Sequence, residues 1–354
     1  MLVKILGIET SCDETAAGIV VDGQHLLSNV VSSSMNLHSV YGGVVPEIAA
    51  RSHIEVVHQV IDSSLKEANC DWQDIDAIAV TRGAGLSGSL LIGVMTARSL
   101  AITKNKPLYG ANHVLGHVYV NFLTSSAQPM YTIPLEKPQF PMLAIIVSGG
   151  HSQLVLFHNH FNYELLGRTQ DDAIGEAFDK VSKILGLGYP GGPAISKAAK
   201  DGDHKAIELP IAKVGGYDFS FSGLKTAVLR RSQELIGEDY TFPSFKLSER
   251  LNESQKTNLA ASFEYIACKT IVNKVKQAIL EYMPSSVVVA GGVAANTELR
   301  KQLRETIDLP LLLPDIKLCT DNGAMIATLG CYMRQFNQST ADPYSLDISP
   351  NLTI

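Results

Sequence analysis

The stretch "VKILGIETSCDETAAGIVVDG" (Val3–Gly23) decides the fold, because it holds two apolar segments separated by a polar loop. Leu2–Ile8 and Gly18–Gly23 are each apolar enough to predict a buried strand. The same order returns in "PMLAIIVSGGHSQLVLF" (Pro141–Phe157). Each stretch therefore predicts a strand–loop–strand hairpin. Two such hairpins in one chain indicate an internal duplication, with each half opening on the same unit.

Strand and helix patterns alternate along the rest of the chain. "DAIAVTRGAG" precedes the helical "SGSLLIGVMTARSLAITKN", and "SVVVAGGVAANTELRKQLRE" reads as strand, turn and helix. This alternation predicts an α/β protein with mixed sheets covered by helices. The proline-rich segment 124–141 is expected to connect two lobes. The expected domains are a first lobe at 1–123, a second at 142–330 with a polar surface excursion at 237–258, and a tail at 331–354.

Composition places the chain among globular enzymes. It has 354 residues, 45% of them hydrophobic and 18% charged, with a net charge of -6. The longest apolar runs are short and interrupted by glycine, so no membrane span is expected. The first residues run directly into a strand pattern and leave no room for a targeting peptide, so we expect a cytoplasmic protein. The five scattered cysteines lack any C-x-x-C pair, which favours reduced thiols.

Four glycine-rich loops are candidates for anion binding. They are "TRGAGLSGS", "VSGGHS", "YPGGPAIS" and "VAGGVAAN". Bare backbone N–H groups at such loops can approach a phosphate closely, although any single loop can also be an ordinary turn. The chain has neither a P-loop motif nor a G-x-G-x-x-G that opens a first helix. Four loops together therefore favour a nucleotide cleft on a different fold.

Two acidic segments have competing interpretations. In "ETSCDET", Asp13 or Glu14 could hold a cation or orient a nucleophile, but a tight turn whose side chains satisfy their own backbone explains the loop as well. In "DDAIGEAFDKVSKILGLG", Glu176 and Asp179 share a helix face beside lysines. A solvated, salt-bridged helix surface explains that pattern equally well.

The segment "ANHVLGHVYVN" places His113 and His117 four residues apart, on one face of a predicted helix. The pair can be a coincidence of packing or two ligands of a metal. The best third ligand is Asp321 in "CTDNGAM", although an aspartate near a helix start is also an ordinary cap. Two imidazoles and a carboxylate with open positions would favour iron(II), with zinc close behind.

Nine motifs together resemble the TsaD family of tRNA N6-adenosine threonylcarbamoyltransferases, once described as glycoprotein endopeptidases, in their bacterial form. The resemblance covers nearly the whole chain, and two residues depart from it. Leu115 stands where many members have glutamate, and Ser196 where many have aspartate. The motifs, in order, are "GIETSCDETAAGIV", "GGVVPEIAARSH", "NHVLGH", "VSGGHSQLV", "DDAIGEAFDKV", "YPGGP", "DFSFSGLKTA", "AGGVAAN" and "CTDNGAMIA".

The resemblance implies an actin-like, sugar-kinase-like (ASKHA) α/β fold of two lobes, each with a ribonuclease-H-like mixed sheet and with nucleotide bound between them. It implies one divalent metal ion per subunit on His113, His117 and Asp321, with iron(II) expected and zinc or another divalent metal as alternatives. Asp13 and Glu14 would correspond to the acidic loop at the reacting end of the substrate. The substrate-binding positions it implies are Ile146, Val147, Ser148, Gly149, Gly150, Asp179, Gly192 and Asn296.

The activity implied by the resemblance is an acyl transfer. The threonylcarbamoyl group of L-threonylcarbamoyl-adenylate would pass to N6 of adenosine 37 in tRNAs that read codons beginning with adenine, with release of AMP. The resemblance also implies TsaB-like and TsaE-like partner proteins. Two alternatives stay open at this point: a metal-dependent protease that uses the histidine pair, and a small-molecule kinase of the same fold.

Overall fold

The computed structural model describes residues 2–354 and divides the chain into two compact units. Unit 1 comprises Met1–Pro138 and Pro314–Ile354, and unit 2 comprises Gln139–Leu313. This division differs from the expected domains in its last part. Residues 314–330, expected in the second lobe, belong to unit 1, and so does the tail at 331–354.

Unit 1 is built on a six-stranded sheet with the order β5-β4-β1-β2-β3-β6. β1 pairs with β2 antiparallel, with Lys4 opposite Val21, and with β4 parallel. The expected first hairpin is therefore confirmed. The strands are β1 (Lys4–Glu9), β2 (Glu14–Val21), β3 (His25–Ser33), β4 (Ala77–Gly83), β5 (Leu108–Asn112) and β6 (Ser125–Ser126).

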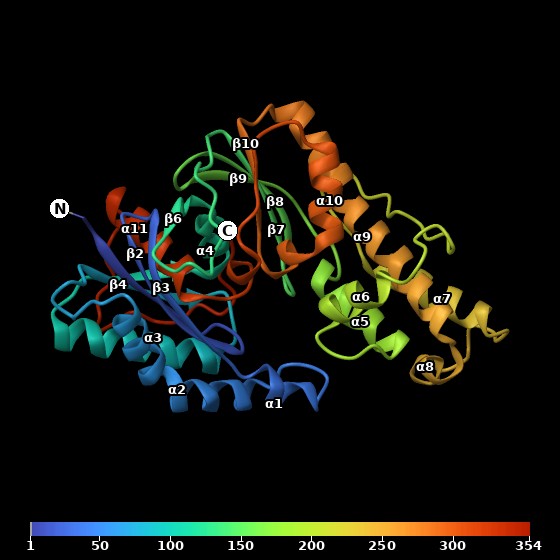
Figure 1. The fold of residues 1–354 in the computed structure, drawn as a ribbon, viewed down its shortest axis with the longest axis horizontal. Coiled ribbons are helices and arrows are strands. Elements are labelled where there is room, and N and C mark those ends of the chain that lie inside the picture. The colour runs from blue at the N-terminus through green and yellow to red at the C-terminus, as the bar shows by residue number, and fades with distance from the viewer. Residues whose placement is uncertain (1) are drawn as a thin grey trace. The chain divides into compact units, whose positions relative to one another are not determined.

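Helices cover both faces of this sheet (Figure 1). α2 and α3 pack against β2 and β4, while α11 lies on β1 and β2. The helices of unit 1 are α1 (Met35–Ser39), α2 (Pro46–Glu67), α3 (Ser87–Lys104), α4 (His113–Tyr119) and α11 (Gly323–Gln335), with short 3-10 turns η1 (Val120–Phe122) and η4 (Ile316–Leu318).

The close approach of α11 explains why the end of the chain belongs to unit 1. A Cβ at Gly7 of β1 would collide with the backbone of Ala327, and one at Gly18 of β2 with the backbone of Ala324. Only glycine allows a helix to lie this near the strands. β1 and β2 are therefore buried on both faces, which is why they read as nearly continuous apolar runs.

Unit 2 repeats the plan with a five-stranded sheet in the order β11-β10-β7-β8-β9. β7 pairs with β8 antiparallel and with β10 parallel, as β1 does with β2 and β4. The second hairpin and the α/β actin-like architecture of two duplicated, ribonuclease-H-like sheets are confirmed. The strands are β7 (Met142–Val147), β8 (Ser152–Asn159), β9 (Asn162–Arg168), β10 (Ser286–Ala290) and β11 (Leu311–Leu312).

The helices of unit 2 include the longest of the described chain, α9, with 30 residues. It begins within the expected polar excursion at 237–258, because Asn252 and Gln255 form a capping box there. The excursion also buries Leu247 and Leu251, so only part of it is irregular surface. The helices are α5 (Ile174–Leu185), α6 (Gly191–Ala199), α7 (Ser222–Leu235), α8 (Leu247–Arg250), α9 (Glu253–Tyr282) and α10 (Thr297–Thr306), with 3-10 turns η2 (Ser244–Lys246) and η3 (Gly292–Ala295).

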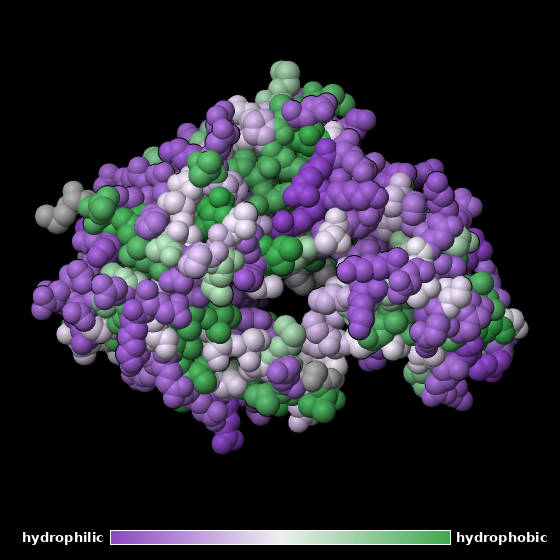
Figure 2. Space-filling view, in the orientation of Figure 1, coloured by the Kyte–Doolittle hydropathy of each residue, from purple (hydrophilic) through white to green (hydrophobic). Residues whose placement is uncertain are grey.

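The surface shown in Figure 2 is mostly polar, with apolar side chains gathered in smaller patches, one of them over α1. Leu37 in α1 and Val40 just beyond it are exposed. Within residues 2–354, no helix is long and apolar enough to cross a bilayer.

Candidate functional site

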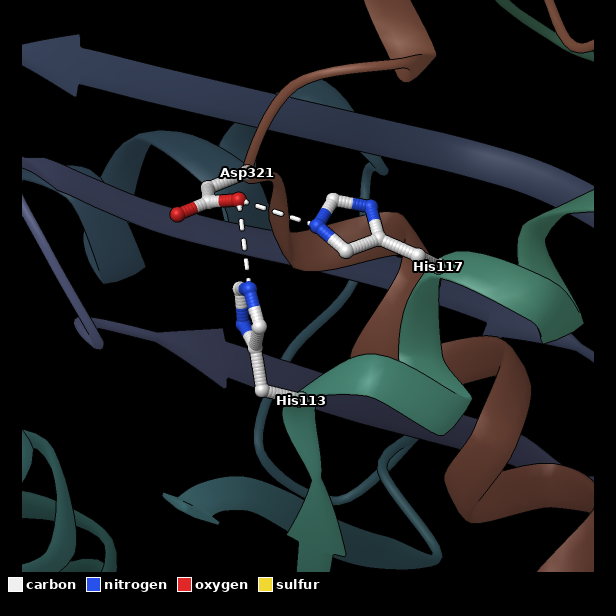
Figure 3. A group of neighbouring side chains, drawn as sticks. All are labelled: His113, His117 and Asp321. Atoms are coloured by element: carbon white, nitrogen blue, oxygen red, sulfur yellow. Dashed lines mark hydrogen bonds and ion pairs between the residues drawn. The ribbon is translucent and has the colours of Figure 1, made fainter. Parts of the chain in front are cut away.

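Three predicted ligands converge in unit 1. Asn112 caps α4 by accepting hydrogen bonds from the backbone N–H groups of Val114 and Leu115, which fixes the start of the helix that carries His113 and His117. Both imidazoles point toward one oxygen of Asp321, which lies just before α11 (Figure 3). Nε2 of His117 lies 3.1 Å from Oδ1 of Asp321, and Nε2 of His113 lies 3.5 Å from the same oxygen.

The electrostatics of this cluster are those of two imidazoles sharing one carboxylate. Burial alone would lower the pKa of His113, but the nearby carboxylates of Asp321 and Glu9 outweigh it and raise the pKa to about 9. Burial likewise works to raise the pKa of Asp321, and the two histidines overcome it and lower that pKa to about 2. In the absence of a metal ion, the raised pKa of His113 favours its protonated form at neutral pH.

The donor set fits a divalent metal ion. The three ligand atoms lie within 4.8 Å of one another, so small side-chain movements would bring them around a single ion. The His117 side chain is 3% exposed and that of Asp321 18%, which shields the cluster while leaving Asp321 reachable. Two imidazoles and one carboxylate leave coordination positions open for substrate or water, the arrangement that suits iron(II) and also zinc.

The acidic loop lies in the same unit, between β1 and β2. Burial, followed by the charges of Asp321 and Asp13, raises the pKa of Glu14 to about 9. Burial also raises the pKa of the Cys12 thiol well above its usual range. Asp13 and Glu14 thus lie within electrostatic reach of the histidine–aspartate cluster.

Two residues that order this region were not singled out by the sequence pattern. His53, buried in α2, contacts the Thr15 hydroxyl through Nδ1 at 2.7 Å and the Cys12 carbonyl through Nε2 at 3.0 Å. Glu9, buried at the end of β1, has a carboxylate oxygen 3.3 Å from Nδ1 of His113. The only sequence signal for Glu9 was a carboxylate at the last position of an apolar strand.

A cavity of about 420 Å³ lies wholly within unit 2. It brings together four predicted substrate-binding residues from four separate segments: Gly149, Asp179, Gly192 and Asn296. A Cβ at Gly149 or Gly192 would meet open space, so the backbone there is accessible to a ligand. The remaining lining residues are Gly175, Phe178, Pro190, Pro193, Ser196, Lys197, Lys200, Gly292, Val293, Ala295 and Thr297.

The other four predicted residues do not line this cavity. The side chains of Ile146 and Val147 are buried in β7. Ser148 closes a tight turn in which its N–H donates to the carbonyl of His151 at 2.8 Å, and Gly150 lies inside that turn. The backbone of Gly149 and Gly150 in this turn is exposed, so the glycine loop can offer main-chain groups to a ligand.

The polar groups at the cavity wall are held by protein partners. Asp179 accepts a hydrogen bond from the N–H of Gly191 at 2.7 Å, and burial raises its pKa. Asn296 caps α10 and donates its amide to Glu264 at 2.7 Å and to Ser196 at 3.1 Å. Ser196 in turn donates its hydroxyl to Glu264 at 2.5 Å. Glu264, a buried residue that the sequence patterns did not indicate, therefore orients both.

The motifs "DDAIG" and "DFSFSG" meet in unit 2 for a structural reason. The carboxylate of Asp171 accepts hydrogen bonds from the Ser220 hydroxyl and from the N–H groups of Phe221 and Ser222. Asp171 thereby fixes the start of α7. This structural role explains the presence of Asp171, and no bound ligand need be invoked.

Fold and site together define a class of protein: an actin-like α/β chain in which two histidines of one helix and a distant aspartate form a group that could hold a metal ion. The fold is also that of solved structures of low sequence identity. The HypF protein of T. kodakarensis matches with a TM-score of 0.58 at 14% identity, over 94% of this chain and 48% of that one.

Within this class, the chain belongs to the TsaD family, tRNA N6-adenosine threonylcarbamoyltransferase, whose family model matches residues 25–328. A relative of that name from Thermomicrobium roseum is 48% identical over 339 residues, which are 94% of this chain and 92% of the relative. Another from Dehalococcoides mccartyi is 45% identical over 352 residues, 99% of each chain. The predicted family is confirmed, and with it membership among the acyltransferases.

Proposed function

We propose that this chain transfers the threonylcarbamoyl group of L-threonylcarbamoyl-adenylate to N6 of adenosine 37 in tRNAs that read codons beginning with adenine. Membership in the TsaD family supports the reaction and its tRNA substrate. The observation that supports a metal-assisted form is the convergence of His113, His117 and Asp321.

The proposed reaction balances as an acyl transfer. The N6 amine attacks the carbamoyl carbon and forms a C–N bond, the bond from that carbon to the phosphate oxygen breaks, and AMP leaves with the electron pair. N6 loses one proton, which passes to solvent. Because the exocyclic amine of adenine is conjugated to the ring, it is a poor nucleophile and needs an activated carbonyl.

The residues of unit 1 are assigned to that activation. His113 and His117 would each offer Nε2, and Asp321 Oδ1, to one divalent ion, with iron(II) as the first choice. When bound, the ion supplies Lewis-acid polarisation of a carbonyl oxygen. Glu14, whose pKa is raised to about 9 by burial and by neighbouring carboxylates in the absence of metal, is assigned as a hydrogen-bonding group at the reacting end of the substrate. Asp13 beside it is assigned as a hydrogen-bond acceptor that orients the reacting groups.

The cavity of unit 2 is assigned to the nucleotide. Its volume of about 420 Å³ falls within the range of small-molecule sites. Main-chain N–H groups at Gly149 and Gly150 are suited to stabilise phosphate charge. The cavity wall offers polar side chains at Asp179 and Asn296. At Gly192 it offers a backbone that a ligand can approach closely.

Partner proteins complete the proposal. We expect a cytoplasmic reaction with a TsaB-like and a TsaE-like partner, the former docking on unit 1. α2 and α3 pack side by side and expose the apolar side chains of Ile54, Leu91 and Met95. An apolar surface of this kind favours a protein partner.

Reconstitution tests the proposal directly. Unmodified tRNA and L-threonylcarbamoyl-adenylate are incubated with the protein, with and without the partners, and nucleosides are measured by mass spectrometry. We expect threonylcarbamoyl-adenosine with the wild type, its loss in His113→Ala, and its retention in His158→Ala, which removes an exposed histidine. A wild-type protein that forms none of this nucleoside in any combination would refute the proposal.

A further inference from the structure

A buried carboxylate stands directly behind one of the two imidazoles. Glu9 is the last residue of β1 and is 0% exposed, and both of its carboxylate oxygens have hydrogen-bond partners. One of its oxygens accepts from the backbone N–H of Ser11 at 2.5 Å. The other accepts from the Thr81 hydroxyl and lies 3.3 Å from Nδ1 of His113.

The surroundings of His113 place a proton on Nδ1, with or without a metal ion at Nε2. A carboxylate only accepts hydrogen bonds, so Nδ1 must donate to Glu9. The Ser11 hydroxyl lies 3.0 Å from the same nitrogen, so its oxygen can accept a share of the Nδ1 proton. Nε2 is then the nitrogen that remains for a metal ion.

His117 has no such support. Within the described part of the chain, no hydrogen-bond partner reaches its buried Nδ1. The two histidines share one helix face and one carboxylate, yet only His113 has an anion behind it. Glu9 therefore supports His113 and not His117.

We propose that Glu9 is a positioning residue for the metal centre: it holds the Nδ1–H of His113 so that Nε2 faces the ion, and it strengthens His113 as a ligand. The inference rests on the metal site of the proposed function. A carboxylate behind a ligating imidazole fixes the ring and raises its basicity, and loss of such a partner weakens metal binding by about 10- to 100-fold.

A purely structural role for Glu9 makes a different prediction. Glu9 also holds Thr81 and the Ser11 backbone, so its replacement could loosen β1 without acting on the metal. Thr81→Val is the matched control, because it removes a hydrogen bond to the same carboxylate and leaves His113 untouched. A positioning role also requires that Glu9→Gln have no further effect once His113 is absent.

The experiment measures the zinc(II) dissociation constant of the full-length protein by competition with a chelator. We expect Glu9→Gln to raise it by about 10- to 100-fold, Thr81→Val to change it less than about threefold, and Glu9→Gln/His113→Ala to bind as His113→Ala does. In the wild type, the zinc-loaded protein should show the Nδ1 proton of His113 downfield of that of His117. This NMR measurement uses the wild type alone, because correlations within each imidazole ring assign the two protons.

The outcomes separate the two claims. A wild type that does not bind zinc overturns the metal site and this inference with it. If the wild type binds zinc and Glu9→Gln binds it equally well, the proposed role of Glu9 is overturned while the metal site stands. The same follows if Glu9→Gln weakens zinc binding by the same factor whether or not His113 is present. Matching Nδ1 proton shifts for His113 and His117 would also overturn it.

Discussion

The proton on His113 makes metal binding depend on pH in a predictable direction. In the metal-free protein, the pKa of His113 is raised to about 9 by the carboxylates of Asp321 and Glu9, against the effect of burial. Because a ligating imidazole must be deprotonated at the bound nitrogen, metal and proton compete below that pH. From pH 9 to pH 7, the affinity should fall about 50-fold in all, with the slope approaching tenfold per pH unit at the lower end.

The same shift has the opposite effect on the stability of the metal-free protein. The folded pKa of His113 lies above its ordinary value of 6.5. The protonated imidazole therefore stabilises the fold below about pH 6.5, and this contribution is lost as the pH rises toward 9. Asp321, with a pKa of about 2, stays ionised throughout this range.

The assay is a zinc(II) competition titration at half-unit steps from pH 6.5 to 9.5, with thermal unfolding of the metal-free protein alongside. His113→Gln is the control, since it removes the titrating group and should remove the dependence of stability on pH that belongs to this site. Zinc affinity that is constant between pH 7 and pH 9 would refute the reasoning, because the competing proton would then be absent.

Three further predictions concern other residues. Asn296→Ala should lower the free energy of unfolding by about 1 kcal/mol, through loss of the cap of α10, and should weaken AMP binding in a calorimetric titration. Ser196→Asp places a second carboxylate beside Glu264 and should destabilise the protein in denaturant unfolding. The double variant Ser196→Asp/Glu264→Gln should recover most of that loss. Additive changes in the free energy of unfolding would contradict the contact between residues 196 and 264. Gly7→Val should cost about 3 kcal/mol or more in the same assay, because a side chain would enter the backbone of α11. An unchanged unfolding midpoint would exclude that packing.

The sequence predicted the elements whose pattern is local. The two hairpins follow from apolar runs on either side of short polar loops, and both are present. The spacing of His113 and His117 indicated one helix face, and both rings point toward Asp321. For Asp321 the local pattern allowed a helix cap as readily as a ligand; it was the best candidate for a third ligand, and the family resemblance implied the same set.

Contacts between distant segments could not be read from the chain. Glu9 and His113 are 104 positions apart, and nothing near Glu9 distinguishes a buried carboxylate from an exposed strand end. Glu264 sits in a long helix whose pattern does not show that it faces Ser196 and Asn296. The return of residues 314–354 to unit 1 depends on glycines in β1 and β2 that admit α11, a complementarity visible only once the helix is in place.

The central claim is that a divalent ion on His113, His117 and Asp321 is required for threonylcarbamoyl transfer to tRNA. The most direct measurement strips the metal, adds iron(II) back in steps, and follows both bound iron and the rate of formation of the modified nucleoside with the partner proteins present. We expect one ion per chain, a rate proportional to occupancy, and no recovery in His113→Ala. Transfer at the full rate by the metal-free protein would contradict it.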